Sequence, residues 1–535
     1  NLEDNHFCGT NKMKNFSSLF LICLCVGTVL SSPYWVKSEG NLLMDEAAVT
    51  FKVALKPQNM NQLESLFWQI SNPDSPLYGR YLSQQQIADL ISLPEGSISL
   101  VESFLKASSG ATCSVLTRRS VHNDYIIVDT CVAQAEHIFP NLKMAVYTKE
   151  GTANSILRSS ILLDVAENLH FLGVPQELHQ HIAGIHDLTD VPVHLTNHSK
   201  IDPEIPWLKS DKQLSITEII GRFGVSDSAI SQEILSSDNA QVRQGVVEFN
   251  HAGFKQSELT SFQERYGLPN VNVTIVGTQD VDEKNLDYVE ASLDVQTITT
   301  IAQGVQTWDF VFDATASFVD VVETLLTTEG APKILSCSWG GLESQFTQSK
   351  IDAVNTAFMK LGLSGFTFFI ASGDSGPTLN PKQCDVFDAQ YPATSAYIVS
   401  VGGTKVTEAT NVEGAWFRGS GGFSNAVPRP AYQDEAVSEY LKNNSLPPNP
   451  QNSRYGTTGR AYPDVSAFGA FYTIAVYGGF KAMGAGTSAA TPQFAGVMTL
   501  INIHRYINGL GPVGPVNQAL YKLEQGVGFD VVEGQ

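Results

Sequence analysis

Residues 486–492 read Gly-Thr-Ser-Ala-Ala-Thr-Pro, a glycine-led turn that places Ser488 at the start of an apolar, periodic segment ending near residue 507. A serine in the first turn of a helix lies close to unpaired backbone N–H groups and to the positive end of the helix dipole. That setting suits a nucleophile whose attack creates an oxyanion. The alternative is a serine that only caps a core helix. Acidic residues elsewhere in the chain bear on this choice.

Glu290 and Asp294 lie four residues apart within residues 287–303, where the pattern predicts a helix, so both carboxyls share one helical face. Two carboxyls this close repel each other, so one tends to hold a proton and the pair titrates as a unit. A solvated acidic face is the plain alternative, because more acidic residues lie just upstream. The apolar neighbours Leu293 and Ile298 instead predict partial burial, which tunes a carboxylate for acid–base work.

Asp374 follows the apolar run 366–371 in the sequence Ser-Gly-Asp-Ser-Gly. The carboxyl ends of parallel strands are where α/β sheets place their sites. In one interpretation Asp374 is a turn residue or a helix cap. In the other, a protonated Asp374 donates a hydrogen bond to an oxyanion.

These three motifs, in this order, resemble those of the sedolisins, or serine-carboxyl peptidases. The resemblance runs from about residue 40 to the end of the chain and includes residues 75–82, 401–404, 421–425, 428–430 and 459–465. It implies an acid-active serine peptidase made as a zymogen, which cleaves peptide bonds through an acyl-enzyme and releases tripeptides from N-termini.

The resemblance also assigns roles. It implies that Ser488 is the nucleophile and Glu290 its general base, that Asp294 orients and buffers Glu290, and that Asp374 stabilises the oxyanion. The chain has Ala485 and, in the nucleophile motif itself, an alanine at position 490 where the family usually has serine. Neither position carries the chemistry, so we expect activity to survive.

A site that uses carboxylates in place of histidine favours activity at acid pH. Histidine has a pKa of about 6.5. At lower pH it is protonated and therefore cannot act as a base. Glutamate, with a reference pKa near about 4.3 raised by burial and by Asp294, suits the acid range. Subtilisin-like peptidases share the serine motif but need a histidine base, and after residue 215 only His251 and His504 remain. Neither has the expected flanking sequence.

Composition excludes some classes of partner. The 535 residues carry 33 Lys and Arg against 54 Asp and Glu, a net charge of −21, and 43% of the residues are hydrophobic. This hydrophobic content is typical of a chain that folds. The negative charge disfavours nucleic acid and anionic lipid as binding partners. The charge also suits a protein that works in an acidic lumen, such as the lysosome.

Residues 13–32 have the charge, apolar run and small residues of a secretory signal peptide, and residues 1–12 are interpreted as leader. This apolar run is too short to span a membrane, and no other apolar run is long enough for a membrane anchor. Sequons begin at Asn197, Asn272 and Asn443 and fit a secretory product. We expect Cys113 and Cys131 to form a disulfide and Cys337 to be a buried thiol, while Cys384 has no evident mate.

The chain divides into four expected parts: leader and signal peptide, residues 1–32; an α+β prodomain with an antiparallel sheet, residues 33–190; a polar activation linker, residues 191–214; and an α/β catalytic domain, residues 215–535. Strands alternating with helices predict a doubly wound, subtilisin-like parallel sheet in the last part. Predicted strands there cover 245–249, 271–276, 333–338, 366–371, 397–401 and 471–477; predicted helices cover 256–266, 287–303, 315–328, 344–361 and 488–507. The resemblance implies that the prodomain acts as chaperone and inhibitor until the linker is cut.

The resemblance also implies a structural Ca²⁺ site near the end of the chain. Asp530 and Val531 match its first ligands, a carboxylate and a backbone carbonyl, but Ca²⁺ requires about six oxygens. The remaining loop is missing from the sequence, so we expect that the chain is truncated at its C-terminal end. Two alternatives to the exopeptidase stay open: a sedolisin-type endopeptidase, and a catalytically silent binding homologue.

Overall fold

The computed structural model describes most of the chain between residues 35 and 523. The described ranges are 35–38, 45–107, 113–149, 155–164, 168–193, 195–197, 214–224, 242–282, 287–377, 387–407, 411–443, 456–469, 473–482 and 486–523. They form two compact units: the described residues within 35–60 and 88–192 belong to the first, and those within 61–87, 193–377 and 387–523 belong to the second. Among the described residues no helix is both long and apolar enough to cross a bilayer.

The first unit contains two antiparallel sheets, as predicted. One has the order β3-β4-β2-β7, the other β1-β5-β6. Their strands are β1 (Trp35–Lys37), β2 (Ala48–Leu55), β3 (Leu116–Arg119), β4 (Tyr125–Cys131), β5 (Met144–Lys149), β6 (Ser155–Ser159) and β7 (Ile182–His186), and the helices are α3 (Glu95–Ala107), α4 (Val132–Ile138) and α5 (Asn168–Phe171). The alternating apolar residues of β2 enter one core with those of α3 and α4. The predicted Cys113–Cys131 disulfide is present, with its Cα atoms 6.1 Å apart.

The second unit is built on an eight-stranded sheet of order β10-β11-β9-β12-β14-β16-β17, with β20 pairing β16. Every pair is parallel except β16 with β17. The strands are β9 (Arg243–Glu248), β10 (Thr274–Gly277), β11 (Gln306–Val311), β12 (Ile334–Cys337), β14 (Thr367–Ala371), β16 (Val399–Val406), β17 (Glu413–Ala415) and β20 (Val465–Phe468). This confirms the predicted parallel sheet, and Cys337 is a buried free thiol within it. The pattern did not reveal β11, β17 or β20.

One predicted strand lies outside the parallel sheet. Residues 471–477 correspond to β21 (Thr473–Val476), which pairs with β22 (Gly479–Ala482) in a two-stranded antiparallel sheet. Tyr477 and Gly478 join them with φ angles of 56° and 66°. Two positive φ angles in a two-residue loop are those of a type I′ hairpin, which turns the chain back on itself.

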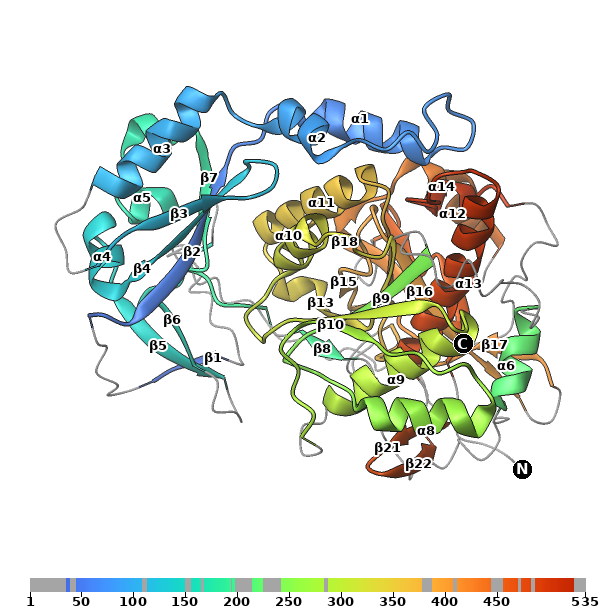
Figure 1. The fold of residues 1–535 in the computed structure, drawn as a ribbon. Coiled ribbons are helices and arrows are strands. Elements are labelled where there is room, and N and C mark those ends of the chain that lie inside the picture. The colour runs from blue at the N-terminus through green and yellow to red at the C-terminus, as the bar shows by residue number, and fades with distance from the viewer. Residues whose placement is uncertain are drawn as a thin grey trace, which may run out of the picture. The chain divides into compact units, whose positions relative to one another are not determined.

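Helices cover both faces of the parallel sheet (Figure 1). They include α6 (Ile216–Arg222), α8 (Gln256–Tyr266), α9 (Asp287–Ile301), α10 (Phe318–Thr327), α11 (Gln348–Leu363), α12 (Asp434–Asn443), α13 (Thr487–Ile507) and α14 (Asn517–Leu520). On β14, Phe368 contacts Phe358 of α11 and Phe369 contacts Phe494 of α13. Because neighbouring strand residues point to opposite faces, α11 and α13 cover opposite faces of the sheet.

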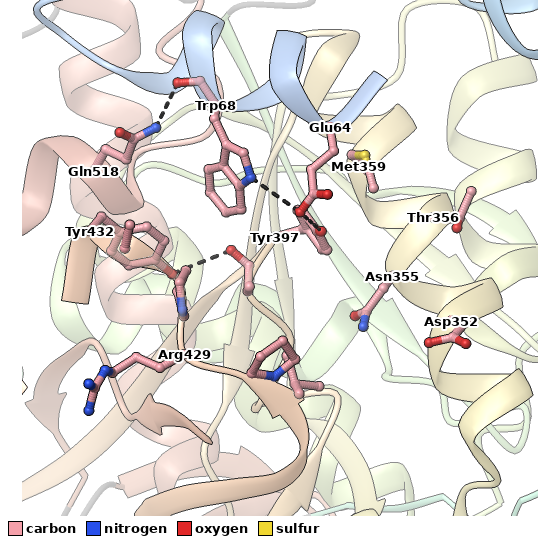
Figure 2. Close-up of a pocket in the computed structure, with 15 residues that line it drawn as sticks. Glu64, Trp68, Asp352, Asn355, Thr356, Met359, Tyr397, Arg429, Tyr432 and Gln518 are labelled. Carbon is pink, nitrogen blue, oxygen red and sulfur yellow. Dashed lines mark hydrogen bonds between the residues drawn. The ribbon is translucent and has the colours of Figure 1, made fainter. Parts of the chain in front are cut away.

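Residues 61–87 precede most of the first unit in sequence but pack within the second unit. They include most of α1 (Met60–Ser71) and the start of α2 (Gln84–Ile91). Glu64 and Trp68 of α1 lie beside Tyr397 and Tyr432 (Figure 2).

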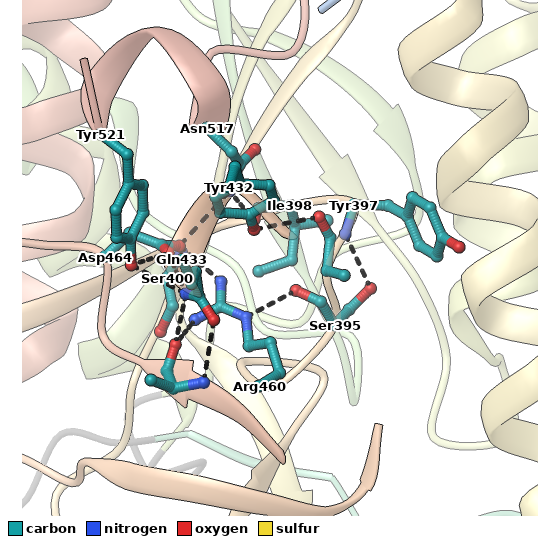
Figure 3. A network of polar contacts seen from close by, with 12 residues as sticks. Ser395, Tyr397, Ile398, Ser400, Tyr432, Gln433, Arg460, Asp464, Asn517 and Tyr521 are labelled. Atoms are coloured by element: carbon teal, nitrogen blue, oxygen red, sulfur yellow. Dashed lines mark hydrogen bonds and ion pairs between the residues drawn. The ribbon is translucent and has the colours of Figure 1, made fainter. Parts of the chain in front are cut away.

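A buried ion pair joins segments around β16. Arg460, on β19 (Gly459–Tyr462), is paired with Asp464, and both side chains are fully buried. Asp464 also accepts from the backbone N–H of Ser400 at 2.8 Å and from the hydroxyl of Tyr521 at 3.0 Å (Figure 3). Such a pair is tolerated in a core because every charge is hydrogen-bonded. The Arg460–Asp464 pair and its hydrogen bonds therefore connect β19, β16 and the end of α14. Strand β19 also pairs with β18 (Gly422–Pro428).

Candidate active site

Ser488 is the second residue of α13, where the sequence predicts it. Gly486 caps the helix in an extended conformation, and its N–H donates to the carbonyl of Gly469 at 2.7 Å. A Cβ on Gly469 would lie 2.8 Å from the carbonyl oxygen of Gly486, so the close approach requires glycine. The Ser488 hydroxyl is fully buried and makes no hydrogen bond to the residues that the structure describes. Its position beside the first N–H groups of a long helix suits an oxyanion.

Asp374 lies at the carboxyl end of β14 and contacts the start of α13. Its Oδ1 accepts from the backbone N–H of Thr487 at 2.8 Å and from the Thr487 hydroxyl at 2.9 Å. Gly373, with a φ of 107°, turns the chain so that its own N–H donates to that hydroxyl at 3.1 Å. Thus Asp374 is attached to the residue that precedes Ser488. Asp374 is buried, and its bond from the N–H of Thr487 satisfies a group at the start of α13, as the helix-cap interpretation expects. The same position leaves Oδ2 for the oxyanion interpretation.

Burial raises the pKa of Asp374 well above its ordinary value. The two hydrogen bonds from Thr487 and the charge of Arg418 act in the opposite sense but do not outweigh it, and the charge of Glu290 adds to the rise. The carboxyl therefore keeps its proton to a higher pH than an exposed aspartate would. While protonated, it has a proton to donate from the oxygen that Thr487 does not occupy.

Glu290 and Asp294 lie one turn apart on α9 and are both fully buried. The helix is buried on all sides from Tyr288 to Ile301, because it packs against β9, β11, α13 and the β21–β22 hairpin. A solvated acidic face is thereby excluded, and burial is complete rather than partial. Burial first, and then the charge of Glu290, raise the pKa of Asp294 well above its ordinary value. Asp294 therefore keeps its proton to a higher pH than an exposed aspartate does.

Two contacts bring α9 against α13. Midway along α13, Gly496 lets this helix approach Ile301 at the end of α9, since a Cβ there would lie 2.7 Å from the Ile301 Cβ. Near the serine, Ala489 packs in one cluster with Val289 and Leu293. The charge of Glu290 also raises the pKa of Asp374, which accepts from Thr487, so Glu290, Asp374 and the residue before Ser488 lie in one buried region.

Two further acidic residues, Glu248 and Asp309, are buried, although the sequence pattern did not single them out. Glu248 ends β9 and accepts from the indole N–H of Trp339 at 2.8 Å. Asp309 lies on β11 opposite Val246 and is fully buried. Burial raises the pKa of both, and the charges of Asp294 and Asp309 raise that of Glu248 further. The available signal was a single acidic residue inside an apolar strand, but β11 itself was not predicted.

The two remaining histidines lie in settings unlike that of the buried acids. His504 is exposed in the last turns of α13, sixteen residues beyond Ser488, which is about 24 Å along the helix axis. This distance excludes His504 as the base for Ser488. His251 lies after β9, and its Nδ1 is 2.9 Å from the carbonyl oxygen of Thr278.

An extended segment lies along the strand that follows β12. Strand β13 (Trp339–Leu342) pairs antiparallel on one side with β15 (Gln390–Tyr391) and on the other with β8 (Thr196–Asn197), which comes from the predicted linker. Trp339 pairs with Asn197 while its own indole contacts Glu248. Backbone pairing at a sheet edge is a common way to bind an extended peptide. Because the indole of Trp339 binds Glu248, the edge of β13 that pairs with β8 lies next to one of the buried acids.

Three residues of interest lie outside the described part of the chain: Asp530 and Val531 of the expected Ca²⁺ site, and Cys384. Among the described residues, no group of three or more His, Cys, Asp or Glu side chains has an arrangement that could hold a metal ion. The Ca²⁺ prediction therefore stays a prediction.

The chain is similar to proteins of known class. The pro-kumamolisin activation domain model matches residues 34–191, and the subtilase family model matches residues 308–508. Tripeptidyl-peptidase 1 of Mus musculus is 30% identical over 521 residues, covering 94% of this chain and 87% of that protein. Tripeptidyl-peptidase 1 of Homo sapiens is 31% identical over 524 residues, with the same coverage.

Among solved structures, Pseudomonas sedolisin, a serine-carboxyl proteinase complexed with pseudo-iodotyrostatin, aligns with a TM-score of 0.45 and 23% identity, covering 58% of this chain and 85% of that one. The identity to tripeptidyl-peptidase 1 over nearly the whole chain is what shows the family. With its activation domain and its subtilisin-like peptidase domain in one polypeptide, the chain belongs to the sedolisin family of serine-carboxyl peptidases, the family of tripeptidyl-peptidase 1.

Proposed function

We propose that this chain is the precursor of an acid-active serine-carboxyl peptidase in which Ser488 is the nucleophile and Glu290 its general base. One observation supports this most: a buried serine hydroxyl begins a long helix in a region whose titratable groups are buried carboxyls. The helix start stabilises negative charge on the substrate, and the carboxyls provide the proton transfers.

In the proposed reaction, ionised Glu290 accepts the Ser488 proton as Oγ attacks the carbonyl carbon of the scissile bond. Protonated Asp374 and the N–H groups of α13 donate to the resulting oxyanion. Glu290 then gives the proton to the leaving amine, which leaves an acyl-enzyme on Ser488. Water then attacks the acyl carbon and gives a proton to Glu290, which passes it to Ser488 Oγ as the ester bond breaks, so the acid product leaves and the free serine is restored. Asp294 holds a proton beside Glu290 and orients it, so that the pair carries one negative charge.

The base is tested by Glu290→Ala and Ser488→Ala, each expected to lower kcat by about 10⁴-fold or more in fully matured protein. Glu290→Gln is the matched control for shape, since it keeps the side-chain volume but cannot accept the proton. Turnover that survives either alanine substitution would refute the assignment. A silent binding homologue would instead fail to react with a peptide aldehyde at acid pH even as wild type.

We further propose that the enzyme removes tripeptides from N-termini, as the name of its relatives states of them. The edge of β13 supports an extended peptide substrate, and a tripeptidase additionally needs a group that captures the free amine. A tripeptide amide with a free N-terminus should therefore be cleaved at least about 100-fold faster than its N-blocked form. Equal rates would indicate an endopeptidase.

The activation domain is proposed to inhibit the peptidase until the linker is cut in an acidic compartment of the secretory pathway, such as the lysosome. The pairing of linker strand β8 with β13 supports this, because it covers the edge proposed to bind substrate. Asn272, in the second sequon, is exposed and therefore accessible to glycosylation. Purified precursor should change mass and gain activity on acidification.

A structural Ca²⁺ ion held in part by Asp530 and Val531 remains a proposal from the family resemblance. Ca²⁺ that binds only the folded protein raises its melting temperature. A chelator should therefore lower that temperature, and Asp530→Ala should abolish the difference.

A further inference from the structure

We propose that residues 61–87 are an anchor that holds the activation domain on the peptidase domain after the linker has been cut. By sequence this segment lies inside the match to the activation domain, yet it packs within the peptidase unit. The proposal rests on the proposed zymogen function. It adds which residues recognise the peptidase and where they bind.

Aromatic contacts form the first half of the anchor. Phe67 of α1 is almost fully buried, and its ring meets Tyr397 edge to face at 5.1 Å. Gly362 of α11 makes this possible, because a Cβ there would lie 2.5 Å from the Phe67 ring. Next to it, Trp68 stacks on Tyr397 at 5.4 Å.

Tyr81 forms the second half, ten residues beyond the end of α1. Its hydroxyl donates to the carbonyls of Pro512 and Val513, at 3.0 and 2.7 Å. Gly365 and Gly514, both with positive φ, lie against its ring, and a Cβ at either position would come closer than 3.0 Å to it. The peptidase unit thus has backbone shaped for two aromatic side chains of this segment.

Hydrogen bonds, most of them between uncharged groups, supplement the aromatic contacts of Phe67 and Tyr81. Gln518 donates to the carbonyl of Trp68 and to the hydroxyl of Ser71, both at 2.8 Å. The N–H of Leu82 donates to the carbonyl of Leu363 at 2.9 Å. Charged groups take part at Glu64, which accepts from the hydroxyl of Tyr397 at 2.8 Å, and at Asp74, which pairs with Lys522. These bonds fix the register of the segment along its whole length.

The anchor does not fill the surface that it covers. A cavity of about 660 Å³ remains beside Trp68, lined by residues of the peptidase unit that include Met359, Tyr397 and Tyr432 (Figure 2). Unfilled volume forfeits dispersion contacts, so the segment is held at its two aromatic points and by its hydrogen bonds rather than over its whole area. Substituting either point should therefore have a large effect on retention.

The test separates docking from catalysis. The full chain carrying Ser488→Ala receives a recognition sequence for a site-specific protease within residues 201–213 and is cut by that protease at neutral pH. Size-exclusion chromatography and dilution then measure how tightly the activation domain is retained. We expect the cut parental protein to co-elute, and Phe67→Ala to weaken retention by about 100-fold or more. Tyr81→Phe, which removes only a hydroxyl, should weaken it by about tenfold.

Leu116→Ala is the matched control, since Leu116 is an exposed side chain of β3 in the activation domain, and it should leave retention unchanged. Circular dichroism before cleavage shows whether each variant folds. If Phe67→Ala does not fold, Tyr81→Phe still tests the proposal. Immediate dissociation of the cut parental protein, or equal retention of parental protein and both anchor variants, would overturn the proposal. No peptidase activity is needed, so failure of the proposed function would show separately, as a wild-type chain without turnover.

Discussion

At the scale of single residues, Asp374 shows how one carboxyl can serve as a donor. Its Oδ1 is occupied by two bonds from Thr487, which leaves Oδ2 to carry the proton. Burial raises its pKa, so the proton stays in place through the acid range and is lost as the pH rises past that raised value. The loss turns a donor into a negative charge beside the developing oxyanion. Activity should accordingly have an upper pH limit set by this residue.

Asp374→Asn should move that limit. An asparagine can accept the Thr487 bonds through Oδ1 and donate through Nδ2 at any pH, so kcat should fall at acid pH but persist toward neutral pH. Asp374→Ala lacks the donor and should lose about 10²–10³-fold in kcat at every pH. The pH–rate profiles of matured enzymes measure both. An Asn variant with an unchanged upper limit would show that another group sets it.

At the scale of elements, the crossing of α9 and α13 brings the acids to the serine. The crossing depends on Gly496, which sits where a side chain on α13 would strike Ile301. Helix propensity would favour alanine here by about 1 kcal/mol. Packing therefore outweighs propensity at this position.

Gly496→Ala should destabilise the second unit by about 1–3 kcal/mol, because overpacking forces the helices apart, and it should lower kcat by displacing Ser488 from Glu290. Gly221→Ala in α6 is the matched control: a Cβ there meets nothing within 4 Å. That variant should be neutral or more stable by up to about 1 kcal/mol. Thermal unfolding distinguishes the two, and equal effects would contradict the packing argument.

At the scale of the whole molecule, the two units differ in their response to acid. In the second unit, burial raises the pKa of Glu248, Asp294, Asp309 and Asp374. In the first unit, the pKa of Asp187 is lowered: burial acts to raise it, but Lys52 and Arg158 outweigh burial. The raised groups stabilise the fold below the pKa of the unfolded chain, about 4, and this stability is lost as the pH rises. Asp187 stabilises above about pH 4 and ceases to do so below it.

Calorimetry of the Ser488→Ala chain should therefore show the second unit losing stability between about pH 4 and pH 7, and the first unit losing it below about pH 4. Asp309→Asn isolates the cause, since it removes one buried carboxyl while keeping its size. It should stabilise the second unit by about 1–3 kcal/mol at pH 7 and change little at pH 4. A pH-independent effect of this substitution would show that Asp309 does not ionise in either state.

The local sequence determined the elements and the chemical groups. Periodic apolar residues located α8 and α13 nearly to the residue, because helix formation and burial follow the same 3.6-residue repeat. Turn glycines before Ser488 and the spacing of Glu290 and Asp294 pointed to the candidate site, since capping and helical faces are local properties. The order of strands and helices likewise predicted the parallel sheet.

Tertiary structure alone decided which distant residues share an environment. Asp309 was missed because β11 mixes polar residues, Asp309 among them, with its apolar ones and is not a continuous apolar run. Strand β21 leaves the parallel sheet because of a hairpin turn. The docking of residues 61–87 on the second unit was equally invisible, because Phe67 and Tyr81 are read locally as ordinary core residues of the segment that contains them. Burial and pKa depend on neighbours hundreds of positions away, which a pattern of adjacent residues does not encode.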